Sequence, residues 1–407
     1  MELLHVRCAG LDVHKDTIVA CARTVEGGKV RHELKSFPTL TRGLLELSDW
    51  LESHGVTCVA MEATGVYWKP AWQLLEGQFE LVLANAAHVK NVPGRKTDAN
   101  DAEWLSDLVA HGLIRSSFVP PEPVQDLRDL TRTRKQIARE VVQHTNRLQK
   151  VLESANIKLA GLITDILGVG GRAILEALVA GETNPEKLAE LAPHVRARPK
   201  QLAEALRGRV REHHRFMLKL HLAQVDALRK SIEEIEARLD HSLASFREAI
   251  ARLITIPGIS STLAWTIVSE IGTDMSRFKT PQHLISWACL CPRNDESAGK
   301  RRSTRIRQGC GWLKESLIQA AWTVGRMKKG YLASQFHRIR ARRGAKKAAV
   351  AVASSILTIA YCLLRDGTTY QDLGGHHFDV RDKQKTMKRL LRRLEQLGVK
   401  VHLQQAV

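Results

Sequence analysis

This 407-residue chain has no pair of cysteines spaced as C-x-x-C, and that absence argues against two common frameworks. A structural zinc site usually needs such pairs, and a disulfide scaffold needs a higher density of cysteine than seven residues in a chain of this length. We therefore expect the cysteines to be buried, reduced thiols of a cytoplasmic protein. They stand at positions 8, 21, 58, 289, 291, 310 and 362.

A secretory signal and a long hydrophobic run are also missing from the sequence. The first residues lack the pattern of a signal peptide. The most apolar stretch, residues 348–364, is rich in small side chains and is interrupted by Ser354, Ser355 and Thr358. Because a membrane-spanning helix needs about 20 mainly apolar residues, we expect this stretch to be a buried helix.

Acidic residues are scarce in one part of the chain. Between Gly299 and Val350 there are 15 lysines and arginines against a single acid, Glu315. The whole chain carries a formal net charge of +19. An excess of this size, concentrated in one segment, favours a polyanionic partner, most often nucleic acid. A basic surface that serves only solubility is the alternative.

The first 120 residues alternate between strand and helix patterns. Apolar and β-branched runs predict the strands, a Gly-Gly pair predicts a hairpin turn, and leucine stripes predict the helices. The predicted order is three strands, helix, strand, helix, strand and helix, over residues 6–13, 17–23, 29–37, 41–53, 56–61, 66–75, 79–84 and from 95 onward.

Four carboxylates occupy particular places in that order. Asp12 lies near the end of the first strand and Glu62 directly follows the fourth, whereas Asp98 and Asp101 belong to the start of the last helix. Residues three apart share one helix face, where two like charges repel each other. A divalent metal site would explain this arrangement. A solvated acidic first turn, which the helix dipole favours, is the alternative.

Strands, helices and acids in this order are typical of the ribonuclease-H-like fold, in its RuvC-like form. The first and fourth strands of such a sheet are neighbours, so we expect Asp12 and Glu62 to converge on the later helix. Converging carboxylates require cations, and oxygen ligands suit two Mg²⁺ ions, with Mn²⁺ as a substitute. Such ions would activate an attacking oxygen and stabilise a leaving oxygen in phosphodiester chemistry. Four unrelated surface acids are the alternative.

Two heptad stripes beyond Pro120-Pro121 predict long helices. The first runs from Leu127 to Val151 and the second from Val225 to Leu253. Such helices form a coiled coil, and the sequence leaves open whether they pack within one subunit or between two. The residues between them, 155–219, are predicted to be further helices and loops with no assigned role.

The last third of the chain carries two features that point to nucleic acid. A Pro-Gly turn between two apolar helices predicts a helix-hairpin-helix, in which the backbone at Gly258 holds a DNA phosphate; an ordinary helical hairpin is the alternative. Further on, Ser297 lies in a small-residue loop, where cations and a metal would favour its alkoxide. A turn or a phosphate contact is the alternative role for this serine. The basic residues predicted to contact nucleic acid are Lys300, Arg301, Arg302, Arg305 and Arg307, within a basic face that reaches Lys347. Trp312, Trp322 and Tyr331 are interleaved in this face, and we expect them to stack on bases.

Five motifs together resemble the DEDD transposases of insertion sequence 110-like elements, a family described as bridge-RNA-guided recombinases. The motifs are Gly-Leu-Asp-Val-His-Lys (10–15), Met-Glu-Ala-Thr-Gly-Val-Tyr (61–67), Lys-Thr-Asp-Ala-Asn-Asp-Ala (96–102), Ile-Pro-Gly-Ile (256–259) and Glu-Ser-Ala-Gly-Lys (296–300). The resemblance covers nearly the whole chain. It departs from the family at 298, where glycine is expected after the serine, and in the greater length of 155–219.

The resemblance implies that the four acids, Asp12, Glu62, Asp98 and Asp101, are catalytic and bind the metal ions. It also implies that Ser297 is the nucleophile that forms a covalent phosphoserine link to DNA. The RuvC-like domain of one subunit would work with the serine-bearing domain of another, in a dimer or tetramer held by the coiled coil. Donor and target DNA would be chosen by pairing with an RNA that the element encodes.

The predicted fold class is therefore α/β followed by mostly α. The predicted domains are a RuvC-like domain at 1–124, a helical coiled-coil region at 125–250, a transposase domain with the serine loop at 251–365 and a basic helical tail at 366–407. We expect an RNA-guided DNA recombinase located at the bacterial nucleoid, with no membrane partner. The alternatives are a RuvC-like nuclease or Holliday-junction resolvase that uses water as its nucleophile, and a non-catalytic nucleic-acid scaffold.

Overall fold

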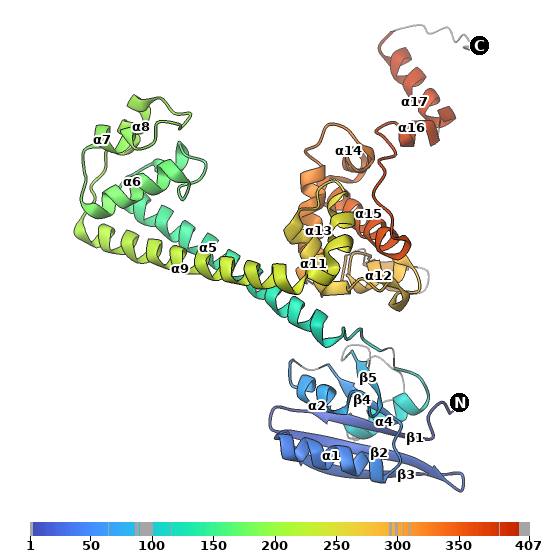
Figure 1. The fold of residues 1–407 in the computed structure, drawn as a ribbon. Coiled ribbons are helices and arrows are strands. Elements are labelled where there is room, and N and C mark those ends of the chain that lie inside the picture. Colours follow the sequence, from blue (N-terminus) through green and yellow to red (C-terminus); the bar gives the residue numbers. More distant parts are fainter. Residues whose placement is uncertain are drawn as a thin grey trace. The chain divides into compact units, whose positions relative to one another are not determined.

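A computed structural model describes most of the chain, which folds into two compact units, Met1–Pro120 and Pro121–Val407 (Figure 1). The residues outside the description are 1–2, 64, 86–88, 90–100, 115, 293–294, 298–299, 304, 308, 310, 382 and 399–407. At 295–297, 300–302, 385–386 and 389 the backbone alone is described.

One mixed sheet forms the centre of the first unit. Its strands are β1 (Arg7–Val13), β2 (Thr17–Glu26), β3 (Lys29–Pro38), β4 (Cys58–Glu62) and β5 (Glu80–Ala84). They lie in the order β3-β2-β1-β4-β5, with β1 antiparallel to β2 and parallel to β4. The predicted pairing of the first strand with the fourth is confirmed. Gly27 and Gly28 supply the two positive φ angles, 59° and 78°, that a two-residue hairpin turn requires.

Helices cover both faces of this sheet, because successive strand residues point to opposite sides. One face packs against α1 (Thr41–Ser53) and α2 (Trp68–Leu75). The core between this face and the two helices includes Leu11 and Met61 of the strands and Leu47, Leu51 and Trp72 of the helices. The other face carries α4 (Asp101–Ala110), whose Val109 and Ala110 pack on Cys8, Cys58 and Ala60.

A glycine in β1 lets α4 lie directly on the strand. A Cβ at Gly10 would stand 2.1 Å from the carbonyl oxygen of Ala102 and 2.6 Å from the backbone nitrogen of Ser106. Neither backbone atom can move away without moving the helix. The start of α4 is therefore held against β1 at this one position.

Two long helices, α5 (Glu122–Ser154) and α9 (Glu212–Ser242), pack against each other in the second unit (Figure 1). Their packing lies within one chain. The prediction that the second stripe continues to Leu253 as one helix is wrong, because α9 ends at Ser242 and the 3-10 turn η2 (Ala244–Phe246) follows. The next helix, α10 (Arg247–Ile254), turns away to bury its apolar side chains against the C-terminal helices.

The segment between α5 and α9 folds around a core of its own. It contains η1 (Leu159–Gly161), α6 (Val169–Ala180), α7 (Pro185–Glu190) and α8 (Pro199–Ala205). Local signals set its boundaries, since Asn184 caps α7 by accepting from the Lys187 N–H, and Gly181 ends α6 with a φ of 105°. Leucine and isoleucine side chains of these helices meet Leu148, Leu152 and Leu222 of the long helices.

The C-terminal helices surround α15 (Ala345–Asp366). Around it lie α10, α11 (Ser261–Ile271), η3 (Met275–Arg277), α12 (Pro281–Trp287), α13 (Gly311–Val324) and α14 (Tyr331–Arg343), followed by α16 (His377–Arg381) and α17 (Lys383–Gln396). Among the described helices, α15 alone is long enough and apolar enough to cross a membrane. Half of its most apolar 18-residue stretch is, however, buried inside the unit. Its packing fits the predicted buried helix.

The first testable consequence concerns Gly10. Gly10→Ala should lower the free energy of unfolding by about 2–3 kcal/mol, because the new methyl group collides with the backbone of α4. Gly161→Ala is the matched control, since no atom lies within 4 Å of a Cβ at that position. Urea denaturation of both variants measures the difference. Equal stability of the two would show that α4 does not lie on β1 as described.

A second consequence concerns the pair His144 and His221 between α5 and α9, whose Nδ1 atoms are 3.3 Å apart. Burial, with His144 and Arg147 nearby, lowers the pKa of His221. Below about pH 6.5 the unfolded chain then binds more protons at this position than the folded chain, so stability is lost as pH falls. The melting temperature of the wild type should fall more steeply between pH 7.5 and 5.5 than that of His221→Gln. The exposed His213→Gln should keep the wild-type slope, and equal slopes in all three proteins would contradict the assignment.

Candidate active site

The strands β1 and β4 end side by side, and an acid lies at each end. Their register pairs Leu11 with Met61, which makes Asp12 and Glu62 the next residues on the two parallel strands. Because Leu11 and Met61 point into the core beneath α1 and α2, the two acids project to the opposite face. That is the face that α4 covers. Both side chains are partly exposed.

The helix α4 brings a third acid to the same end of the sheet. Asp101 is its first residue, and Ala102 contacts Gly10, two residues before Asp12. The first turn of α4 therefore lies beside the ends of β1 and β4. Asp98, the fourth predicted acid, lies outside the described residues.

An ion pair fixes the angle of α4 on the sheet. Arg23 of β2 is 3% exposed, and its Nε donates to the Asp107 carboxylate at 2.9 Å. His32 approaches the same carboxylate, with 3.2 Å between Nε2 and Oδ1. A buried guanidinium is costly unless it is paired, so this contact holds the middle of α4 in one place.

One neighbour of the acids was not foreseen from the sequence as part of the site. The Nε2 atom of His14 lies 3.1 Å from Oδ2 of Asp12. The signal for this contact is present in the sequence, because His14 is two residues after Asp12 and so projects to the same side of the chain.

The donor atoms at this end of the sheet suit a hard divalent cation, since they are carboxylate oxygens. Among the described residues they do not gather within 4.8 Å of one another, and only His5, Cys58 and Glu80 form a group that tight. Those three residues lie at the other end of the strands. Cys58, for example, is four residues before Glu62 on β4. Burial raises the pKa of the Cys58 thiol to about 12, so it is neutral at physiological pH and is not a ready metal ligand.

The predicted serine lies on a hairpin of the second unit. The strand β6 (Asp295–Ser297) pairs with β7 (Lys300–Ser303), and Ser297 faces Lys300 in the last pair before the turn. The side chains of Ser297, Lys300, Arg301 and Arg302 lie outside the description. A bridge between Pro292 and Ile306 closes the base of this hairpin.

Two cations fasten the chain after the hairpin. The Arg307 guanidinium donates to the carbonyl and hydroxyl oxygens of Ser286 at 2.5 and 2.6 Å, and Lys314 donates to the Arg307 carbonyl at 3.0 Å. Arg307 thus has an internal structural partner, whereas Arg305 is exposed. Contact of either residue with nucleic acid stays a prediction.

The Pro-Gly turn joins α10 to α11 as a helical hairpin. Gly258 has a φ of 88°, and a Cβ there would lie 2.8 Å from Val324 Cγ2 and 2.9 Å from the Ala320 carbonyl oxygen. The turn therefore packs closely on α13, which by itself explains the glycine. A DNA phosphate at Gly258 stays a prediction.

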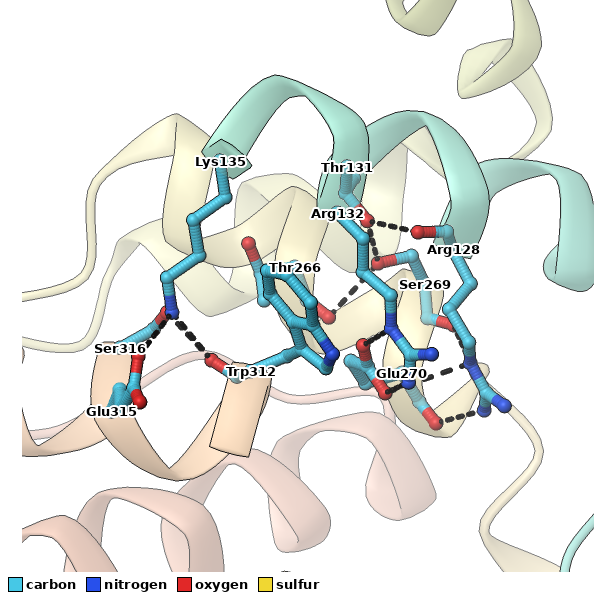
Figure 2. A network of polar contacts seen from close by, with 10 residues as sticks. All are labelled: Arg128, Thr131, Arg132, Lys135, Thr266, Ser269, Glu270, Trp312, Glu315 and Ser316. Atoms are coloured by element: carbon cyan, nitrogen blue, oxygen red, sulfur yellow. Dashed lines mark hydrogen bonds and ion pairs between the residues drawn. The ribbon is translucent and has the colours of Figure 1, made fainter. Parts of the chain in front are cut away.

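A buried carboxylate joins α5 to α11 (Figure 2). Glu270 is 1% exposed and accepts two hydrogen bonds from Arg132, at 2.7 and 2.9 Å. Arg128 donates to the Glu270 carbonyl at 2.7 Å, and the hydroxyls of Thr131 and Ser269 are 2.9 Å apart. Paired in this way, the buried charge specifies one position of α5 against α11.

The same face of α5 holds the start of α13 (Figure 2). Lys135 donates to the Trp312 carbonyl at 3.1 Å and to the Ser316 hydroxyl at 3.2 Å, and it pairs with Glu315 at 3.2 Å. Arg132, Lys135 and Arg139 also lie over the Trp312 ring, at 5.4–5.7 Å from its centroid. This ring was expected to stack on bases, yet its contacts are made within the chain.

Mixed α/β architecture, a five-stranded sheet and acids at the ends of β1, β4 and the start of α4 are consistent with a ribonuclease-H-like DEDD domain. A helical second unit follows it. The sequence model of the DEDD transposases of IS110 matches residues 9–157, and that of the transposase IS116/IS110/IS902 family matches residues 250–338. Together the two models cover more than half of the chain.

Curated relatives agree with this assignment. A "probable family 20 transposase" of Pseudomonas aeruginosa is 27% identical over 89% of this chain and 94% of its own length. The transposase for insertion sequence element IS1111A of Coxiella burnetii is 24% identical over 90% of this chain and 92% of its own. The transposase for IS1328 of Yersinia enterocolitica is 25% identical over 80% of this chain and 89% of its own.

The chain belongs to the IS110 family of insertion-sequence transposases. It is therefore an enzyme that cleaves and joins DNA, and its DEDD domain uses a divalent metal. Neither family model extends over residues 158–249.

The contribution of the buried Glu270 carboxylate to stability can be measured by substitution. Glu270→Gln should cost about 3 kcal/mol of stability, because two arginines lose the charge that compensates them in a buried site. Glu236→Gln is the matched control, since it breaks a partly exposed pair with Arg134 and should cost less than about 1 kcal/mol. Chemical denaturation measures both. A loss at Glu270 no larger than that at Glu236 would contradict the role given to this contact.

Proposed function

We propose that this transposase is an RNA-guided, site-specific recombinase that cuts and rejoins DNA through a phosphoserine intermediate. The observation that carries the proposal is the pair Asp12 and Glu62, adjacent in register on one face of the sheet, in a chain that also carries Ser297 on a basic hairpin. The acids suit metal-assisted phosphodiester chemistry, and the serine supplies a nucleophile other than water.

The acids form the metal-binding set in this proposal. Asp12, Glu62, Asp98 and Asp101 would hold two Mg²⁺ ions, with Mn²⁺ as a substitute. When bound, these ions neutralise the carboxylates and offset negative charge on the reacting phosphate. The Nε2–H of His14 donates a hydrogen bond to Oδ2 of Asp12 and thereby restricts the orientation of that carboxylate.

Ser297 carries the covalent step. Its Oγ loses a proton, forms a bond to the phosphorus, and the bond from phosphorus to the oxygen of the departing strand breaks. That oxygen takes up a proton and leaves as a free hydroxyl. One phosphoester replaces another, so the energy of the broken bond is kept and the reverse reaction can join the serine-linked strand to a new hydroxyl.

Basic residues on and after the hairpin would hold the DNA backbone during this exchange. We assign this role to Lys300, Arg301, Arg302, Arg305 and Arg307, with the backbone at Gly258 as a further phosphate contact. Charge supports the assignment, because the surrounding segment has a single acid among its lysines and arginines.

The assembly completes the proposal. We propose a dimer or tetramer in which the coiled-coil helices α5 and α9 hold the subunits together, so that the DEDD domain of one subunit serves the serine of another. An RNA from the element pairs with donor and target DNA and selects the sites. The protein acts at the bacterial nucleoid in the cytoplasm.

The test uses purified protein, the RNA that flanks the gene in its element, labelled donor and target DNA, and Mg²⁺. Denaturing electrophoresis should reveal a protein–DNA adduct, and Ser297→Ala should reduce its formation at least about a thousandfold while DNA binding is kept. Ser303→Ala, at the far end of the same hairpin, is the matched control and should form the adduct normally.

Two outcomes would overturn parts of the proposal. Cleaved DNA with no adduct in the wild type would identify a RuvC-like nuclease that uses water. Equal adduct and recombination with and without the RNA would remove RNA guidance and leave the serine chemistry in place.

A further inference from the structure

The segment at the far end of the long helices is a folded domain without an assigned role. We call residues 155–211 the tip domain. It lies within the part of the chain that neither family model covers, apart from its first three residues. Its helices α6, α7 and α8 enclose a hydrophobic core that includes Ile174, Leu188, Leu202 and Leu206, all at most 2% exposed. This core continues into Leu148, Leu152 and Leu222 of the long helices, which makes the domain a stable platform.

Specific contacts hold this platform on the long helices. Arg172 of α6 makes two hydrogen bonds of 2.7 Å to the Asp226 carboxylate on α9. The Arg209 N–H donates to the Ala155 carbonyl at 2.8 Å. A Cβ at Gly208 would lie 2.3 Å from that same carbonyl oxygen, so the loop after α8 is pressed against the end of α5.

Two loops of the tip domain present cations at alternate positions, one on each side of α8. Arg196, Arg198 and Lys200 are exposed before and at its start, and Val195 packs on the core. Arg209 and Arg211 are exposed after its end, and Val210 packs on the core between them. The backbone at Arg211 is extended, with φ −87° and ψ 166°. In an extended chain alternate residues such as Arg209 and Arg211 project to one side about 7 Å apart, which is of the same order as the separation of successive phosphates along a nucleic-acid strand.

Acids do not neutralise these cations. Residues 193–211 contain six lysines and arginines and one acid, Glu204. Glu204 and Glu186 both pair with Arg207. Among the residues that the structure describes, no acid forms an ion pair with Arg196, Arg198, Lys200, Arg209 or Arg211.

Some cations elsewhere on the same helical assembly have acidic partners. Arg172 pairs with Asp226 and Glu176, and Arg134 pairs with Glu236. Cations that lack acidic partners repel one another, and a bound polyanion relieves that repulsion.

The composition of the tip domain indicates which polyanion fits. Residues 155–211 contain no phenylalanine, tyrosine or tryptophan. Proteins that hold single strands commonly stack bases on such rings, and this domain has none to offer. Cations without stacking rings suit the backbone of a duplex, where the bases are already paired and stacked.

We propose that the tip domain binds the sugar-phosphate backbone of duplex DNA through Arg196, Arg198, Lys200, Arg209 and Arg211. Between Arg139, which pairs with Glu315 of α13, and Leu152, in the tip core, α5 rises about 20 Å. That length corresponds to about six base pairs of DNA. The tip domain thus contacts DNA that flanks the region near α13. The proposal rests on the chain acting on DNA and is independent of the serine chemistry.

The experiment measures the affinity of the full-length protein for a fluorescein-labelled 40-base-pair duplex of arbitrary sequence, by anisotropy between 50 and 300 mM salt. Backbone contacts do not depend on sequence, so the target site is not required. The variants are Arg196→Gln/Arg198→Gln/Lys200→Gln and Arg209→Gln/Arg211→Gln. The control is Lys187→Gln/Arg207→Gln, which removes two charges of the same domain that acids already neutralise.

Each lost phosphate contact should reduce the slope of log affinity against log salt by about 0.9. We expect a reduction of about 3 for the triple variant and about 2 for the double variant, with affinity at least about tenfold lower at 150 mM salt. The control should bind as the wild type does. Circular dichroism melts establish that every variant is folded.

Slopes and affinities of both variants equal to those of the control would overturn the proposal. A 40-nucleotide single-stranded RNA of the same label gives the second arm. Loss of RNA affinity with duplex affinity unchanged would also overturn it, in favour of an RNA-binding surface. Because the experiment measures binding and needs no cleavage, failure of the serine mechanism does not affect the result.

Discussion

The parallel pairing of β1 with β4 is the constraint on which the site in the first unit depends. Asp12 and Glu62 are 50 residues apart in sequence, and only the register Leu11–Met61 makes them neighbours. The same register sends both side chains to the face that α4 covers. Gly10 then allows α4 to approach so closely that Asp101, at its start, reaches the same end of the sheet. One strand pairing and one missing side chain thus place three acids from three elements at the same end of the sheet.

The second unit depends on a different kind of contact. Its long helix α5 presents arginines and lysines to α11 and α13, where they meet Glu270, Glu315 and the Trp312 ring. These contacts fix the end of α5 next to the helix that follows the serine hairpin. At its other end α5 supports the tip domain. A rigid helix therefore connects the proposed flanking-DNA surface with the region that carries Ser297.

Much of this organisation could be predicted from the sequence, and the reasons are local. Apolar and β-branched runs located the first two strands, alternation located the third, and the Gly27-Gly28 pair located the hairpin between the second and third. The acids were recognisable because each stands at the end or start of such an element. The family resemblance, which the comparisons confirm, added the role of Ser297, which no spacing in the chain could supply.

What the sequence did not reveal depends on contacts between distant residues. The heptad spacing of apolar residues continues through Leu239, Phe246 and Leu253, although α9 ends at Ser242. The spacing continues because α10 also has an apolar face, which it buries against different helices. The core of the tip domain joins residues from Leu148 to Val225, and no single window displays it. Trp312 was expected to be available for stacking, but its cationic partners on α5 lie more than 170 residues away.

The measurement that tests the central claim most directly asks whether the acids of the sheet control the chemistry of the serine. Adduct formation is measured in Mg²⁺ with Glu62→Gln and Asp12→Asn proteins that retain Ser297, beside Glu80→Gln at the other end of the sheet as a control. We predict that both site variants bind DNA but form no detectable adduct, while Glu80→Gln forms it at the wild-type rate. Undiminished adduct in Glu62→Gln and Asp12→Asn would contradict the claim that these carboxylates and Ser297 act on one phosphodiester.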